Sequence, residues 1–300
     1  MSGLNSSQNL KEILSRYNFQ FHKGLGQNFL LDGNIIRKII SSANLSNDDI
    51  VVEIGPGAGT LTSVLANCVR KVIAVELDLR LLPILKENLD GIDNVDLVFE
   101  DALKVDYDSL IMHKCKQFPA CSQRSYKIIS NLPYGITTPI LMYLLRKKFN
   151  FSSLIVMVQR EVSSRLISVP GGRDYGNLSA VVQYYTVPEV LFMVSRTVFY
   201  PRPEVESAVV LLAKRTAPLV EAPDEDLFFN LIRCAFGQRR KTILNTLSSG
   251  HLITGLSRQQ WKEIIQSAGI DTSRRGETLS LKEFSDISWR CWEYKSLENT

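Results

Sequence analysis

The sequence has no apolar run long enough to cross a membrane, because its longest apolar stretches are strand-length and are broken by charged residues. Its first residues, MSGLNSSQNLKEILSRY, also lack the basic and then apolar layout of a secretory signal. Cysteine is scarce: there are five, an odd number, with no Cys-x-x-Cys pair. This usage fits reduced thiols better than a disulfide framework. These absences predict a cytoplasmic protein without a membrane partner.

Metal ligands and net charge are equally sparse. Of only three histidines, His113 lies near Cys115 and Cys121, but a structural zinc site usually needs four ligands at tighter paired spacings. We therefore expect a polar surface loop there, and no metal. The net charge is +4, from 35 basic and 31 acidic residues, which is too small to indicate a nucleic-acid partner by itself. Local basic clusters would have to hold any anionic partner.

Between about residues 48 and 214, strand-like apolar runs alternate with helical patterns. This alternation predicts β-α-β units on a parallel sheet. The runs are apolar on both faces, as expected where helices cover both sides of the sheet. The strand-like runs are 50–55, 71–77, 95–100, 126–132 and 153–159, and the helical patterns are 60–68, 79–89 and 138–148. Two later runs, 188–195 and 206–215, look like a strand pair that completes the sheet.

The pattern changes after residue 214. A Pro-rich, acidic linker, APLVEAPDED, precedes four helical segments, 225–237, 238–249, 257–269 and 280–294. Ser280 and Glu283 form the capping-box pattern at the start of the last helix. The sequence thus predicts an N-terminal extension with a short helix (1–22), an α/β domain (23–214) and a small all-helical domain (215–300).

Three signals at successive strand ends indicate a nucleoside-binding site. Gly55 and Gly57 follow the first strand and precede a helix, so a ligand could approach the backbone there. Glu76 ends the second strand, where an acidic residue accepts hydrogen bonds from ribose hydroxyls, and Asp101 follows the third, where it could face an adenine amino group. The loop reads G-x-G-x-G and lacks the full dinucleotide fingerprint. S-adenosylmethionine, which has no pyrophosphate, therefore fits better than NAD.

The fourth strand ends in Asn131-Leu132-Pro133-Tyr134. The Asn131 side-chain oxygen and the Leu132 carbonyl could accept hydrogen bonds from an exocyclic amino group and raise its nucleophilicity. Pro133 stiffens the turn and removes a donor, and Tyr134 offers a ring on which a base could stack. The target adenine would have to leave its stack to enter. A glycine loop, two acids and this turn together predict direct methyl transfer to a flipped-out base.

These motifs resemble those of known families. E-x-G-x-G-x-G followed by an acid is similar to the class I methyltransferases, and Asn-Leu-Pro-Tyr resembles the (D/N)-x-P-(Y/F) motif of enzymes that methylate base amino groups. KGLGQNFLLD, QREVSSRLISVPGGRDYGNLSAVVQYY, VFYPRPEVESAVV and AFGQRRKTILNTL resemble the ribosomal RNA adenine dimethyltransferases, from about residue 7 to residue 285.

The resemblance implies a Rossmann-like, mostly parallel seven-stranded sheet with helices on both faces, plus the helical C-terminal domain. It implies N6,N6-dimethylation of two adjacent adenosines near the 3′ end of 16S rRNA in the assembling small ribosomal subunit. The donor-binding residues it implies are Asn28, Leu30, Gly55, Glu76, Asp101 and Asn131. Phe199 matches an aromatic residue that helps to enclose the target base in this family.

Basic clusters are the candidate RNA contacts, because phosphate contacts supply affinity with little sequence choice. For any single residue a solvated helix face is an equally ordinary role. We expect a monomer. The candidate RNA contacts are Arg146, Lys147, Lys148, Arg233, Arg239, Arg240 and Lys241.

Three alternatives are open at this stage. A macrolide-resistance methyltransferase that acts on 23S rRNA shares the fold and the Asn-x-Pro-Tyr motif. The segments LGQNFL and AFGQRRKT favour the ribosomal RNA adenine dimethyltransferases instead. A non-catalytic RNA-binding assembly factor could keep the fold, although the complete set of Gly55, Glu76, Asp101 and Asn131 argues for retained chemistry. A nicotinamide oxidoreductase lacks both the full dinucleotide loop and a proton-relay histidine.

Overall fold

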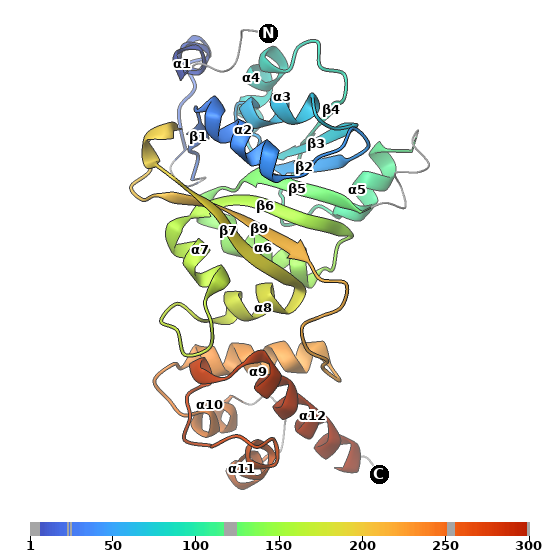
Figure 1. The fold of residues 1–300 in the computed structure, drawn as a ribbon, viewed down its shortest axis with the longest axis vertical. Helices are drawn as coiled ribbons and strands as arrows, with labels where there is room; N and C mark the ends of the chain where they lie inside the picture. The colour runs from blue at the N-terminus through green and yellow to red at the C-terminus, as the bar shows by residue number, and fades with distance from the viewer. Residues whose placement is uncertain (1–6, 23, 25, 117–124, 251–255, 299–300) are drawn as a thin grey trace. The chain divides into compact units, whose positions relative to one another are not determined.

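The computed structural model describes residues 7–22, 24, 26–116, 125–250 and 256–298. The chain forms two compact units (Figure 1). Unit 1 comprises Met1–Ser163 and Val187–Lys214, and unit 2 comprises Ser164–Thr186 and Arg215–Thr300. The end of unit 1 at Lys214 matches the expected boundary. Segment 164–186 clusters with the C-terminal helices, whereas the sequence assigned it to the α/β domain.

Unit 1 contains the strands of the fold. They are β1 (Phe29–Leu30), β2 (Ile50–Ile54), β3 (Lys71–Glu76), β4 (Val95–Phe99), β5 (Tyr126–Asn131), β6 (Phe151–Gln159), β7 (Thr186–Val194), β8 (Phe199–Tyr200) and β9 (Ser207–Lys214). Its helices are α1 (Ser7–Arg16), α2 (Gly33–Ser42), α3 (Thr60–Ala66), α4 (Leu82–Asn88), α5 (Tyr107–Lys114) and α6 (Thr137–Arg146), and α7 (Arg160–Ile167) begins in it.

The main sheet has seven strands in the order β4-β3-β2-β5-β6-β9-β7 (Figure 1). The pairs from β4 to β6 are parallel, and β9 joins β6 antiparallel. The five predicted parallel strands and the closing strand pair are thereby confirmed. Strand order reverses at β2, because β3 lies on one side of it and β5 on the other. Ligands of open α/β sheets bind at such a switch point, outside the carboxyl ends of the strands.

Burial explains the all-apolar strands. Every residue of β2 and β3 is buried, so both faces of the sheet are covered at its centre. On one face, α2 and α3 pack against β2, β3 and β5 through a core that includes Ile36, Ile39, Leu61, Leu65 and Val72. Fully burying such a side chain contributes about 1.5–3 kcal/mol. The core thus fixes the sheet whose strand ends form the site.

A second core cluster holds the N-terminal helix in place. Leu10, Ile13 and Leu14 of α1 are buried with Ala58 and with side chains of the α4 region. At the end of α1, Arg16 forms an ion pair with Glu87 of α4 (2.6 Å). The predicted short N-terminal helix is confirmed over residues 7–16 and belongs to unit 1.

Unit 2 contains helices α8 (Asn177–Tyr185), α9 (Glu225–Gly237), α10 (Ile243–Ser249), α11 (Arg258–Ser267) and α12 (Leu281–Glu298). The predicted Ser280–Glu283 capping box is present, with Glu283 N donating to Ser280 Oγ and Ser280 N to Glu283 Oε2. One prediction was wrong: α10 does not begin at Gln238. Thr242 caps it by accepting from Asn245 N, so 239–241 lie in the preceding turn. No helix in the described part of the chain is long and apolar enough to cross a membrane.

Candidate active site

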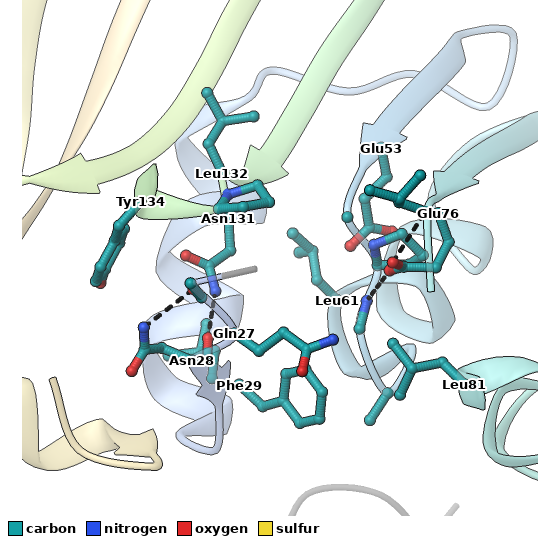
Figure 2. A pocket seen from close by; sticks show the side chains of 18 of the residues that line it. Gln27, Asn28, Phe29, Glu53, Leu61, Glu76, Leu81, Asn131, Leu132 and Tyr134 are labelled. Carbon is teal, nitrogen blue, oxygen red and sulfur yellow. Dashed lines mark hydrogen bonds between the residues drawn. The ribbon is translucent and has the colours of Figure 1, made fainter. Parts of the chain in front are cut away.

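A cavity opens at the carboxyl ends of β2, β3 and β5, all within unit 1 (Figure 2). Its empty volume is about 950 Å³, which includes the solvent-open mouth. Of the predicted site residues, it brings together Asn28, Leu30, Gly55, Gly57, Glu76, Asn131, Leu132, Pro133 and Tyr134. Asp101 and Phe199 do not line it.

The glycine loop between β2 and α3 forms the floor of the cavity. Gly55 and Gly57 have φ angles of +73° and +57°. Glycine adopts such positive φ angles without steric cost because it has no Cβ atom. A Cβ on Gly57 would lie 2.8 Å from the Phe29 ring, and one on Gly55 3.3 Å from Pro133. The glycines therefore let the loop pass close to both β1 and the turn after β5, with room left for a ligand.

Glu76 occupies the second strand end. It is buried, and its carboxylate accepts from Leu77 N and Asp78 N, both at 2.9 Å, and from Gly57 N at 3.3 Å. Burial is the largest influence on this carboxyl and raises its pKa, while the three backbone N–H groups lower it. Because Oε1 takes two of these bonds and Oε2 only the long one, Oε2 retains acceptor capacity toward the cavity.

The sequence analysis did not assign a role to Glu53, which also lines the cavity. The residue is 1% exposed, and its Oε2 has no hydrogen-bond partner among the described residues. The pKa of this carboxyl is raised to about 8: burial is the largest cause, the Thr62 hydroxyl lowers the pKa, and the nearby Glu76 raises it. Figure 2 shows Glu53 and Glu76 on one side of the cavity. The residue before the glycine loop was noted in the sequence, but its burial required the structure.

Asn131 ends β5 with its amide oriented by a backbone contact. Its Nδ2 donates to the Asn28 carbonyl at 2.9 Å. The assignment of amide N and O follows from this bond, and it leaves Oδ1 buried without a partner among the described residues. The Tyr134 hydroxyl is held by Ser207 of β9 at 2.5 Å. Asn131 and Tyr134 face the cavity from the side opposite Glu53 (Figure 2).

The short strands β1 and β8 place Phe199 beside the turn that follows β5. Leu30 of β1 pairs with Phe199 of β8 in an antiparallel bridge. The Phe199 ring is 3% exposed, and its centroid lies 6.5 Å from that of Tyr134 in an edge-to-face arrangement. Phe199 thus packs against Tyr134 beside the cavity, and its enclosure of a target base stays a prediction.

Asp101 follows β4 as expected, yet its carboxylate points to its own turn. Oδ1 accepts from Leu103 N at 3.0 Å, and Lys104 lies 3.9 Å from Oδ2. A short acidic side chain commonly caps the turn that follows it. The adenine-facing role of Asp101 therefore stays a prediction that needs the ligand.

The candidate RNA contacts differ in how strongly they are already engaged. Arg239 donates to Glu277 at 2.6 Å and to the Arg173 carbonyl at 2.9 Å, and Arg233 donates to Asn230. Arg146 is half-buried, whereas Arg240 and Lys241 are exposed in the turn before α10, and Lys147 and Lys148 at the end of α6. An arginine held by two structural bonds has fewer donors left for phosphate.

Within the described residues, no group of three or more His, Cys, Asp or Glu could hold a metal ion. Cys121, the third member of the cluster noted in the sequence, lies outside those residues. The donor set of the cavity is instead carboxylate, amide and backbone oxygen around a glycine loop. Such a set suits a nucleoside with hydroxyl and amino groups.

A mostly parallel seven-stranded sheet with this cavity at its switch point is the Rossmann-like methyltransferase fold. Solved structures agree. A dimethyladenosine transferase from Plasmodium falciparum superposes with a TM-score of 0.70 at 24% identity, covering 89% of this chain and 98% of that one. The 23S rRNA methyltransferase ErmE gives 0.62 at 25% identity, covering 87% and 98%.

Sequence comparison identifies the family. The model of the ribosomal RNA adenine dimethylase family matches residues 18–287. The ribosomal RNA small subunit methyltransferase A of Pelotomaculum thermopropionicum is 52% identical over 279 residues, which are 93% of this chain and 94% of that protein. The chain therefore belongs to the ribosomal RNA adenine dimethylase family and is a methyltransferase.

Proposed function

We propose that this enzyme transfers methyl groups from S-adenosylmethionine to N6 of two adjacent adenosines near the 3′ end of 16S rRNA, within the small ribosomal subunit. The family match and the name of the 52% identical relative support the RNA class and the subunit. The number and position of the adenosines rest on the sequence resemblance.

The observation that carries the proposal is the unpartnered Oδ1 of Asn131. Because Asn28 fixes the amide, the oxygen is left buried beside the cavity as an unused acceptor and cannot rotate away without losing the 2.9 Å bond. A buried acceptor without a partner costs about 1–3 kcal/mol. An incoming amino group would satisfy it, so the site is arranged to gain free energy from a donor such as adenine N6.

The remaining residues fit a nucleoside donor. When bound, S-adenosylmethionine supplies a methyl group on a sulfonium that is already a good leaving group. Oε2 of Glu76 can accept from a ribose hydroxyl, and the loop at Gly55 leaves the backbone open to the ligand. The Tyr134 ring offers a stacking face. The Asn131 side-chain oxygen and the Leu132 carbonyl would accept hydrogen bonds from the two N6–H groups. These bonds would tilt the N–H groups out of the ring plane and orient the nitrogen lone pair toward the methyl carbon.

No base in the described part of the cavity has to remove a proton before attack. N6 can attack first, so that the new C–N bond forms as the C–S bond breaks and its electron pair stays on sulfur. The extra proton on nitrogen then leaves to water. The protein contributes mainly alignment and electrostatic orientation of the reacting atoms, which are large terms in catalysis.

A 23S rRNA substrate is the second candidate, since ErmE shares the fold. Its identity to this chain is 25%, compared with 52% for the small-subunit relative, which favours the small subunit. A non-catalytic assembly role is disfavoured because the Asn131 acceptor and the Glu76 carboxylate are both in place.

The test is methyl transfer from radiolabelled S-adenosylmethionine to small ribosomal subunits that lack the modification, followed by nucleoside analysis. Labelled N6,N6-dimethyladenosine in 16S rRNA is the expected product. Label only in naked 23S rRNA would reassign the substrate. Donor binding without label in either RNA would replace the enzymatic proposal with the assembly role.

A further inference from the structure

A short segment of the N-terminal region reaches across the cavity. Its described residues are 18–22, 24 and 26–28, here called the arm, which lead from α1 to β1. Before it, the Tyr17 hydroxyl donates to Glu87 of α4 at 2.7 Å. After it, β1 pairs with β8. Gln27 and Asn28 of the arm line the cavity, so the position of the arm decides the shape of the donor site.

We propose that Asp78 and Arg80 form a latch that holds the arm against the cavity and thereby sets the affinity for the methyl donor. The identity of that donor rests on the proposed function. Neither Asp78 nor Arg80 lines the cavity, so both act as positioning residues through Gln27 and the neighbouring backbone.

Asp78 is the centre of the latch. It is 7% exposed, and its Oδ2 accepts from Gln27 Nε2 at 2.8 Å. Arg80 donates two hydrogen bonds to the same carboxylate, from Nε to Oδ1 at 2.7 Å and from Nη2 to Oδ2 at 2.6 Å. Bidentate hydrogen bonds between an arginine and a carboxylate combine strength with a fixed geometry. The carboxylate therefore has one orientation in which it can receive Gln27.

Arg80 also touches the arm directly at two further points. Its Nη1 donates to the Gln20 carbonyl at 3.3 Å, and its guanidinium carbon lies 5.4 Å from the centroid of the Phe19 ring. Because the side chain of Arg80 is about half exposed, the ion pair by itself contributes little stability. The Asp78–Arg80 pair instead positions the arm, because it contacts Phe19, Gln20 and Gln27.

The latch is continuous with the proposed ribose site at Glu76. Figure 2 shows Gln27 extending from the side of Asn131 toward Glu76. The other end of the Gln27 amide, Oε1, accepts from His22 N at 3.1 Å. Asp78 N in turn donates to Glu76 Oε1 at 2.9 Å. Releasing the Asp78 side chain would thus loosen the arm right beside the Glu76 carboxylate.

A loosened arm must be ordered again when the donor binds, and that ordering lowers the affinity. The methyl-accepting turn keeps its bond to Ser207, and Asn28, whose carbonyl orients Asn131, adjoins the β1–β8 pair, which the latch does not touch. Chemistry in the bound complex should therefore be little affected. We expect Arg80→Met and Gln27→Met each to raise the donor KM about tenfold, the loss typical of one charge-assisted hydrogen bond. Arg80 does not line the cavity, so Arg80→Met should keep kcat within about twofold.

The matched control is Arg70→Met, which breaks the Arg70–Asp48 ion pair elsewhere on unit 1. Donor dissociation constants from calorimetry, steady-state KM and kcat, and hydrogen exchange of residues 18–28 are measured for each variant. The double variant Gln27→Met/Arg80→Met should be no weaker than the poorer single variant, because both remove the same constraint. Arm exchange should accelerate in the latch variants and stay unchanged in Arg70→Met.

Two failures are distinguishable. If the wild type binds no S-adenosylmethionine, the proposed function is wrong. If the wild type binds it, but Arg80→Met and Arg70→Met have equal donor affinities and equal arm exchange, the latch is overturned. A fall in kcat with unchanged KM would also overturn it, by assigning the pair to the chemical step.

Discussion

The side-chain Nδ2 of Asn131 donates to the backbone carbonyl of Asn28 over 2.9 Å, joining two residues that lie 103 positions apart in the sequence. The bond links the strand end that would hold the target base to the segment that leads into β1. It fixes the orientation of the Asn131 amide and leaves Oδ1 buried without a partner among the described residues. One contact thus joins the turn after β5 to the segment before β1.

Replacement of Asn131 tests that orientation. Asn131→Ala removes the acceptor, so kcat for methyl transfer should fall by about a hundredfold, the scale seen when one oriented polar group is removed from a catalytic site. Affinity for S-adenosylmethionine should change little, because Glu76 and the glycine loop remain. Single-turnover transfer and calorimetric donor binding, measured on the same preparation, check both. Unchanged turnover would remove Asn131 from the mechanism.

Glu76 is expected to show the opposite pattern. Glu76→Gln keeps the size of the side chain but loses the negative charge and half of its acceptor capacity. Since Leu77 N and Asp78 N bond to the same oxygen, donor affinity should fall about tenfold or more. Calorimetry with S-adenosylmethionine is the measurement. Equal affinity in the variant would show that the ribose contact is elsewhere.

The bond between Tyr134 and Ser207 provides a third test. Ser207 is fully buried, and its bond sets the tilt of the Tyr134 ring, whose neutral hydroxyl is maintained because burial raises its pKa. Tyr134→Phe and Ser207→Ala should each lower kcat/KM for RNA about five- to tenfold.

The double variant Tyr134→Phe/Ser207→Ala should be no worse than either single change, because the two substitutions break the same bond. Ser63→Ala, which removes a buried hydroxyl that bonds within α3, is the control for a general loss of stability. Additive effects in the double variant would mean that Ser207 does not act through Tyr134.

Sequence periodicity predicted the sheet and the strand-end residues well, since buried parallel strands carry continuous apolar runs and their ends meet at one edge. It could not predict β1 and β8, because strands of two residues have no period. The same limit hid the contact between Leu30 and Phe199. Glu53 was visible as a residue before the loop, but only its burial shows that its charge is suppressed.

Charge clusters were the least predictable part. Arg239 belongs to the basic run before α10, yet its pairing with Glu277 depends on tertiary contacts 38 positions apart. The start of α10 was misplaced for a related reason: the run QRRK continues an acceptable helical pattern. Thr242 overrides that pattern because its hydroxyl caps the helix.

RNA binding should therefore depend on Arg240 and Lys241 more than on Arg239. Replacing both by alanine should weaken binding to small ribosomal subunits and reduce the slope of log affinity against log salt by roughly one per residue. Arg258→Ala/Lys262→Ala, on exposed positions of α11, is the charge-matched control. A salt slope equal to that control would move the RNA surface elsewhere.

Glu53 makes stability depend on pH in a direction opposite to that of an ion-paired carboxylate. Its pKa is about 8 in the folded chain, against 4.5 for an unperturbed glutamate, so between these values the folded state keeps a proton that the unfolded state has released. Stability contributed by this group is then present below about pH 4.5 and is lost as the pH rises toward 8. The full loss is at most roughly 5 kcal/mol.

Glu53→Gln isolates this effect, since the amide mimics the protonated carboxyl and does not titrate. Urea unfolding at pH 5.5, 7 and 8.5 should give a variant that gains stability over the wild type progressively as the pH rises. Comparing the two chains at each pH cancels the other titrating groups, Glu76 included. If the difference in unfolding free energy between the two chains stays constant over this range, Glu53 is already ionised in the folded protein. The cavity would then carry two negative charges, on Glu53 and Glu76.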